Sequence, residues 1–369
     1  MRVLVLRGSH YEMGLQHGQQ ARDLGATILA TLKARIRHLE QRADLDDAVR
    51  QVETAWQKNA PSTIAMLKGI ADGLTIQFAR LFRYAIASYL DDLLLGDSKL
   101  GIASHRPLAM TDKQCPETEA CTVWAAAGLA TRDGAPILTK NRDYTLAHLP
   151  LQMLADAAPQ SGYRYLYVTS AGSPAVFSSG MNEKGLAVAD THVSSRDIGP
   201  GLARYTLMMN LLEQHASVAS ALAYLRETLQ MGAGNLALAD AQGDLAVCES
   251  GYRQCGFIAP LEHTVVATNH FVSAQLRDAY LEHPPGARAE SQARHAVVRT
   301  VLQNVWGRWD VEKTQALMSR HEEEQTAICR HNSRSEAVTI SNAIFLPAER
   351  KLLFCNSQPC QGSYSAHAL

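Results

Sequence analysis

The chain has 369 residues, of which 46% are hydrophobic and 19% charged, ordinary values for a globular protein with a large core. Its 35 basic residues nearly balance 36 acidic ones, for a formal net charge of −1, so neither nucleic acid nor an anionic membrane is expected as a partner. The apolar run at the N-terminus is too short for a membrane span or a signal peptide, and we expect a cytoplasmic protein.

The first third of the chain is predicted to be mostly helical. After a short strand within residues 1–8, apolar residues recur at helical spacing, and Gly14 and Gly18 are spaced for close helix packing. The expected helices are Tyr11–Leu24, Ala26–Leu39, Asp44–Lys58, Ser62–Leu74 and Phe78–Leu95. The polar stretch Gly101–Glu119 carries Pro107 and Pro116 and predicts a linker.

Beyond the linker the pattern predicts strands interrupted by pairs of helices. Asp133-Gly134 separates two apolar runs, Cys121–Ala125 and Pro136–Thr139, which indicates a β-hairpin. Further strands are expected at Arg164–Thr169, Ala175–Ser178, Leu186–Thr191, Asn235–Asp240, Leu245–Glu249, Thr264–Thr268, Val338–Phe345 and Lys351–Phe354, with helices at Ala203–His215, Val218–Gln230, Ser291–Val305 and Val311–Arg320. This alternation predicts an α+β protein with helices covering antiparallel sheets.

Cys121 is the strongest candidate for a catalytic residue. It stands at the start of a predicted strand, directly after the linker, and would become a new N-terminus if the chain were cut between Ala120 and Cys121. Its own α-amino group, with an unperturbed pKa near 8, could then serve as the general base for its thiol. The hairpin would bring Asn141 and Asp143 back beside Cys121, where both could orient the new terminus.

Several motifs, in order, resemble a known family. They include Gly8–Gly14, Gly69–Gly73, Cys121-Thr122, Asn141-Arg142-Asp143, Gly180–Leu186, Asn235–Asp240, Thr268–Phe271, Ile328–His331 and Pro359-Cys360. Taken together, they resemble the peptidase C45 group of N-terminal-nucleophile hydrolases, which includes isopenicillin N acyltransferase. The choloylglycine hydrolases are more distantly similar.

The resemblance implies a four-layer αββα fold and a precursor that cleaves itself. Residues 1–120 would form the small chain, and residues 121–369 the catalytic segment. Cys121 would carry the acyl group as a thioester, and the side-chain amide of Asn269 would stabilise the oxyanion. Water or an amine would resolve the thioester, so the expected partners are a small acyl amide, or an acyl donor and an amine. No bound cofactor is implied, and an acyl-CoA would enter only as a substrate.

The residues leave two alternatives open. Ala120 stands where the fungal acyltransferase has glycine, which is compatible with an unprocessed binding protein on the same fold. A conventional Cys–His hydrolase built on Cys329 or Cys121 is the second. The seven cysteines include no Cys-x-x-Cys pair, and Cys329-x-His331 lacks a second pair of ligands, so no metal site is expected.

Overall fold

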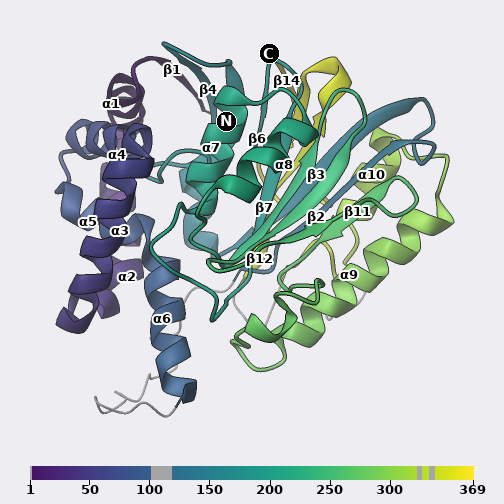
Figure 1. The fold of residues 1–369 in the computed structure, drawn as a ribbon. Coiled ribbons are helices and arrows are strands. Elements are labelled where there is room, and N and C mark those ends of the chain that lie inside the picture. Colours follow the sequence, from purple (N-terminus) through teal and green to yellow (C-terminus); the bar gives the residue numbers. More distant parts are fainter. Residues whose placement is uncertain (1, 101–118, 322–325, 332–336) are drawn as a thin grey trace.

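The computed structural model describes residues 2–100, 119–321, 326–331 and 337–369. Apart from Glu119, the predicted linker therefore lies outside the described residues. The first third contains strand β1 (Val3–Gly8) and helices α1 (His10–Gln20), α2 (Gly25–Glu40), α3 (Asp46–Asn59), α4 (Pro61–Leu74), α5 (Phe78–Ala85) and α6 (Ala87–Leu100). These helices gather at one end of the molecule (Figure 1). The single helix predicted from Phe78 to Leu95 is interrupted at Ile86, the C-cap residue directly after α5.

The rest of the chain is built on two sheets. Among the described residues, the larger has eight strands in the order β1-β4-β5-β6-β7-β8-β9-β10, and the smaller has six in the order β11-β2-β3-β12-β13-β14. The strands are β2 (Thr122–Gly128), β3 (Gly134–Tyr144), β4 (Gln152–Pro159), β5 (Tyr165–Ser170), β6 (Ser179–Asn182), β7 (Ala187–His192), β8 (Gly234–Ala239), β9 (Leu245–Ser250), β10 (Gly256–Ile258), β11 (Thr264–Ala267), β12 (Val338–Leu346), β13 (Lys351–Cys355) and β14 (Ser365–Ala368).

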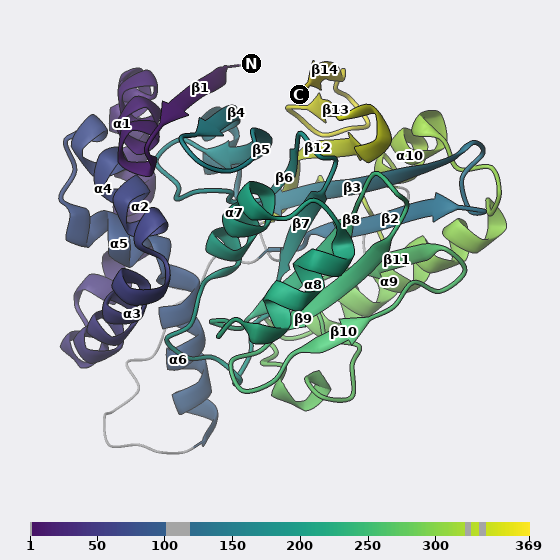
Figure 2. The same cartoon turned by 45° about the horizontal axis from the view of Figure 1, so that its top comes forward.

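In the described part of the chain, four more α-helices cover the sheets: α7 (Arg204–Gln214), α8 (Val218–Glu227), α9 (Ala287–Asn304) and α10 (Val311–Met318). In Figure 2, α7 and α8 lie on the opposite side of the sheets from α9 and α10. Short 3-10 helices occur at Arg22–Leu24, Ala43–Leu45, Leu146–Leu151, Arg277–Ala279 and Pro347–Glu349. None of the helices in the described ranges is long and apolar enough to cross a membrane.

Alternating side chains divide the core into layers. Leu236 and Leu238 of β8 belong to the cluster shared with α1–α8, whereas Ala237 and Ala239 belong to the cluster between the sheets. In β2, Val123 and Ala125 face the other sheet, and Trp124 packs with residues of α9 and α10. A strand can serve two cores in this way because successive side chains point to opposite faces. The order is therefore helix, sheet, sheet, helix, and the predicted αββα fold is confirmed.

The predicted hairpin is confirmed, and its register places Thr122 opposite Asn141. Other elements differ from the prediction. The strand expected at Ala175–Ser178 is displaced to Ser179–Asn182, and Ala175 instead has a positive φ of 44°. Strands β4, β10 and β14 were not predicted. Strand β1 pairs in parallel with β4, so the first segment contributes an edge strand to the larger sheet.

Helices α1 and α4 approach closely through glycines, as the spacing of Gly14 and Gly18 predicts. A Cβ atom on Gly14 would lie 2.1 Å from the carbonyl oxygen of Met66, and one on Gly69 would lie 2.1 Å from that of Tyr11. Both obstacles are backbone atoms, which cannot rotate away. The contact therefore requires glycine on both helices.

Gly14→Ala should lower the free energy of unfolding by about 1–3 kcal/mol, because the added methyl group forces α1 away from α4. Gly25→Ala is the matched control. Gly25 has helical dihedral angles, and no described atom lies within 4 Å of its would-be Cβ, so this change should be neutral or stabilising by up to about 1 kcal/mol. Urea denaturation measures both. Equal effects of the two changes would contradict the close-packing explanation.

Candidate active site

The candidate site lies at one end of the smaller sheet. There β2 begins directly after Cys121, β11 ends shortly before Asn269, and their antiparallel pairing runs to Ala267 opposite Val123. Continuing this register brings Asn269 opposite Cys121. Both follow the alternation of the residues that face the larger sheet, so their side chains share the inner face.

Cys121 is buried, with only 1% of its surface exposed. Its Sγ makes long contacts with Oε2 of Glu119 at 4.0 Å and with the backbone oxygen of Asp143 at 3.8 Å. Burial raises the pKa of the Cys121 thiol to about 12; Lys140 opposes this rise, and the Glu119 carboxylate adds to it. The thiol of the uncut chain is therefore protonated near neutral pH and needs a base before it can attack.

Arg294 binds the peptide group that joins Ala120 to Cys121. Its Nη1 donates to the carbonyl oxygen of Ala120 at 2.6 Å, to that of Cys121 at 2.9 Å and to Oγ1 of Thr122 at 3.0 Å. Its Nη2 donates to Oδ1 of Asn269 at 3.2 Å. Burial lowers the pKa of Arg294 to about 10, and repulsion from Arg330 contributes. Because this pKa is still well above 7, the guanidinium stays charged at neutral pH.

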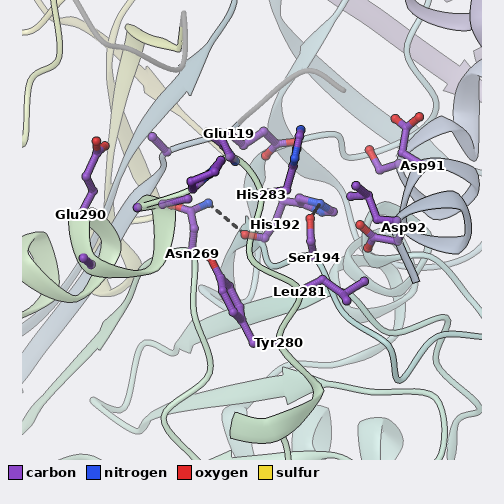
Figure 3. A pocket seen from close by; sticks show the side chains of 18 of the residues that line it. Asp91, Asp92, Glu119, His192, Ser194, Asn269, Tyr280, Leu281, His283 and Glu290 are labelled. Atoms are coloured by element: carbon purple, nitrogen blue, oxygen red, sulfur yellow. Dashed lines mark hydrogen bonds between the residues drawn. The ribbon is translucent and has the colours of Figure 1, made fainter. Parts of the chain in front are cut away.

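Asn269 connects the two sheets. Its Nδ2 donates to the backbone oxygen of His192, the last residue of β7, at 2.9 Å, while its Oδ1 accepts from Arg294. Figure 3 shows the bond to His192 at the wall of a pocket. The amide is thus held in one orientation at both ends, which is the condition for a preorganised hydrogen-bond donor.

Asn141 and Asp143 lie on the opposite face of β3 from Lys140 and Arg142, because side chains alternate along a strand. Nδ2 of Asn141 donates to the backbone oxygens of Met318 at 2.9 Å and Ile328 at 2.8 Å. The hairpin thus brings Asn141 into register beside the start of β2, as predicted, but its amide holds the loop after α10. Its predicted catalytic role stays a prediction.

Asp143 accepts a hydrogen bond from Oγ1 of Thr339 at 2.7 Å, and its other carboxylate oxygen is buried with no hydrogen-bond partner among the described residues. Burial raises the pKa of Asp143 to about 6, although Arg330 and Arg294 oppose the rise. Its backbone, rather than its carboxylate, is the part in hydrogen-bond contact with the Cys121 thiol. The predicted role in holding the new amino terminus is untested.

A buried cluster of charges lies on the inner face beside Cys121. Lys140 pairs with Asp190 at 2.5 Å, and Arg204 binds the other oxygen of the same carboxylate at 3.0 Å. Burial alone would raise the pKa of Asp190, but the two cations hold it below its usual value. Burial and the Asp190 charge raise the pKa of Glu119, which Arg204 and Lys140 partly offset. Glu119 therefore holds a proton more readily than an exposed carboxyl group does.

Two cavities lie beside Glu119, the residue before the Ala120–Cys121 peptide. The larger, of about 310 Å³, is lined by Ala120, Asn269 and Arg294 together with the acidic side chains Asp91, Asp92, Glu119 and Glu290. Asp91 and Asp92 lie on one side of this pocket and Glu290 on the other (Figure 3). The smaller, of about 60 Å³, is lined by Glu119, Lys140, Arg142 and Asp143, among others. Glu119 thus borders both cavities, and Ala120 borders the larger one.

Sequence reasoning missed Arg294, although a signal was present. Helix α9 buries Ser291, Arg294, Val298 and Leu302, a spacing that marks the inner face of an amphipathic helix. An arginine on such a face requires buried hydrogen-bond partners. The residues that supply them, Ala120 and Cys121, lie more than 170 positions earlier. The helix alone does not show which carbonyl groups they are.

The sequence matches a known family. The model of the acyl-coenzyme A:6-aminopenicillanic acid acyl-transferase family matches residues 129–361, well over half of the chain. The chain therefore belongs to this family, and the resemblance inferred from its motifs is confirmed. The match spans Asn141, Asp143 and Asn269 but begins after Cys121. No curated protein matches the sequence.

Several solved structures are similar to the chain at low identity. A mutant conjugated bile acid hydrolase from Clostridium perfringens has 13% identity and a TM-score of 0.44, covering 67% of this chain and 97% of its own. An N-acylethanolamine-hydrolyzing acid amidase ortholog from Caenorhabditis elegans has 16% identity and a TM-score of 0.47, with coverages of 68% and 100%. Penicillin V acylase from Agrobacterium tumefaciens has 14% identity and a TM-score of 0.40, with coverages of 64% and 83%.

The raised pKa of Asp143 predicts a pH-dependent stability. The folded protein holds the Asp143 proton up to about pH 6, whereas the unfolded chain releases it near the ordinary aspartate pKa of 3.8. The folded state binds more protons between these values, so the free energy of unfolding falls as pH rises through this window. Asp143→Asn removes the effect. The stability difference, variant minus parent, should grow by about 2–3 kcal/mol from about pH 4 to about pH 7.

Denaturant unfolding at each pH measures this difference, with Cys121→Ala in both chains so that neither can use that thiol. Any packing effect of Asp143→Asn appears equally at both pH values and cancels. A difference that does not change with pH would show that the Asp143 carboxyl group titrates normally.

Proposed function

We propose that this protein cuts its own chain between Ala120 and Cys121 and then uses Cys121 as an N-terminal nucleophile to hydrolyse or transfer amide-linked acyl groups. The observation that carries the proposal is the contact of Arg294 with the carbonyl oxygen of Ala120 at 2.6 Å. A buried cation on that oxygen would stabilise the negative charge that develops when a nucleophile attacks the carbonyl carbon. The neighbouring thiol of Cys121 is the nucleophile closest along the chain.

The self-cleavage step needs a carrier for the thiol proton. In our proposal, Sγ of Cys121 bonds to the carbonyl carbon of Ala120 and the Ala120–Cys121 C–N bond breaks. Glu119, 4.0 Å from Sγ, accepts the thiol proton and delivers it to the released nitrogen. Water then hydrolyses the thioester, leaving a carboxyl group on Ala120 and a free thiol and amine on Cys121. No other reactant is required.

Cleavage would also open the site. In the uncut chain Glu119 and Ala120 line the larger cavity, whereas Cys121 is buried and is not among the residues that line it. Once the peptide bond is cut, Glu119 and Ala120 are free to move away, and the cavity then reaches Cys121. Its volume of about 310 Å³ lies at the small end of the range for ligand sites, about 300–1,000 Å³, so the proposed substrate is a small molecule.

The same groups would then act on the substrate. The α-amino group of Cys121 serves as base for its thiol, and the substrate's acyl group passes to Sγ as its amine leaves with a proton. Asn269, fixed by His192 and Arg294, donates to the oxyanion. Water or a second amine resolves the thioester. The family's name supports acyl transfer, and acyl-CoA is one candidate donor. The proposed reaction uses no bound cofactor.

Intact-mass spectrometry tests the cleavage. Purified wild-type protein should give two fragments that meet at Ala120/Cys121, whereas Cys121→Ala should give one unbroken chain, because the attacking sulfur is missing. Cys248→Ala is the matched control, since Cys248 is another fully buried thiol, and it should be cut like the wild type. An unbroken wild-type chain would refute the proposal and favour an unprocessed binding protein on the same fold.

The contribution of Arg294 is measured by the rate of cleavage. Arg294→Met should slow the appearance of fragments about 100- to 1,000-fold, the usual effect of removing one oxyanion donor. Arg294→Lys should recover part of the rate, because it restores a cation. Arg299→Met, on the same helix, should cleave normally. Thermal unfolding of each variant confirms folding, and a folded Arg294→Met protein that cleaves at the wild-type rate would remove Arg294 from the mechanism.

A further inference from the structure

Two cysteines and two histidines meet beside the loop that follows α10. Cys329 and His331 belong to this loop, His321 follows α10 closely, and Cys360 lies in the turn after β13. Potential ligand atoms of His321, His331 and Cys360 all lie within 4.8 Å of one another. Cys329 is the fourth member, with its Sγ 3.6 Å from Sγ of Cys360 and 3.7 Å from Nε2 of His331. The second pair that the Cys-x-His sequence lacks is thus supplied by the fold.

We propose that these four residues form a structural zinc site, which revises the expectation of no metal drawn from the sequence. Zinc in structural sites prefers four tetrahedral ligands, with bonds of about 2.3 Å to sulfur and about 2.0–2.1 Å to nitrogen. Tetrahedral angles then separate two sulfurs by about 3.8 Å and a sulfur from a nitrogen by about 3.6 Å. The distances from Sγ of Cys329 to Cys360 and to His331 agree with these two values. Nε2 of His331 lies 3.0 Å from Sγ of Cys360, so this pair would open by about half an ångström.

The surroundings also suit a zinc ion. Nδ1 of His321 is 2.9 Å from the backbone oxygen of Ser319, to which its N–H can donate, leaving the Nε2 lone pair for a metal. Two thiolates balance the double charge of zinc, so a bound ion adds no net charge to a half-buried site. A Cys329–Cys360 disulfide is the competing reading, but its sulfurs would have to approach from 3.6 Å to about 2.05 Å, and it gives the two histidines no role.

The ion would stabilise the loop after α10, which contacts residues of the candidate active site. Arg330 lies between Cys329 and His331, and its charge opposes the rise that burial causes in the pKa of the Asp143 carboxyl group. One residue earlier, the backbone oxygen of Ile328 accepts from Asn141. Zinc would tie this loop to the end of α10 and to the turn after β13. The inference does not depend on self-cleavage, because none of the four ligands takes part in that step.

Titration of reduced, metal-free protein with cobalt(II), followed by displacement with zinc, tests the site. We expect one cobalt per chain, with the visible bands of tetrahedral coordination and the near-ultraviolet thiolate-to-cobalt band, both lost when zinc is added. His321→Asn removes an exposed ligand without touching the core, so it should fold normally and weaken cobalt binding about 10- to 100-fold or more. Cys360→Ser should abolish the thiolate band.

Cys255→Ser is the matched control, because it removes a thiol outside the cluster and should leave the titration unchanged. Zinc should also raise the thermal midpoint of the wild type but not of Cys360→Ser. Octahedral cobalt spectra, or equal binding by wild type and His321→Asn, would overturn the proposal. So would a Cys329–Cys360 disulfide, found by peptide mapping, in protein that binds no zinc after reduction.

Discussion

The buried guanidinium of Arg294 fixes the geometry around the Ala120–Cys121 peptide. A charge that is 2% exposed requires hydrogen bonds inside the protein. The two terminal nitrogens of Arg294 donate to two carbonyl oxygens and to the side chains of Thr122 and Asn269. Helix α9, the start of β2 and the residues after β11 are thereby joined at one point. Moving any one of them would deprive the Arg294 cation of some of its hydrogen-bond acceptors, so the layers beside the candidate nucleophile cannot shift independently.

Local patterns predicted most of the fold. The Asp133-Gly134 hairpin, the helical first third and the pairing of helices with sheets follow from residue spacing and turn chemistry, which act over short distances. Strand β4 was missed, and its pairing with β1 joins segments about 150 positions apart. The displacement of the strand predicted at Ala175 has a different cause. The backbone of Ala175 has a positive φ, which is rare for residues other than glycine, so the extended conformation that its apolar neighbours predict does not form there.

The sequence predicted which residues lie near the candidate site more completely than it predicted how their side chains are arranged. Cys121 and Asn269 share the inner face of the smaller sheet. Asn141 points to the outer face, because it stands between Lys140 and Arg142 along β3 and successive side chains of a strand point to opposite faces. Arg294 and the four residues of the proposed zinc site come together only through tertiary folding. A single sequence contains the ligands but not their distances, and pairs such as Cys329 and Cys360 have no local signature.

The parallel pairing of β1 with β4 has a consequence for the lifetime of the molecule. The residues before Ala120 include β1, an edge strand of the larger sheet, and helices that pack in the core on the helical side of that sheet. A cut before Cys121 would therefore leave two polypeptides that both contribute strands to one sheet. Spontaneous refolding would then require two separate chains to meet and would slow on dilution. The lifetime of a cut protein of this kind would depend on how slowly its two chains unfold, and each molecule would in effect be assembled only once.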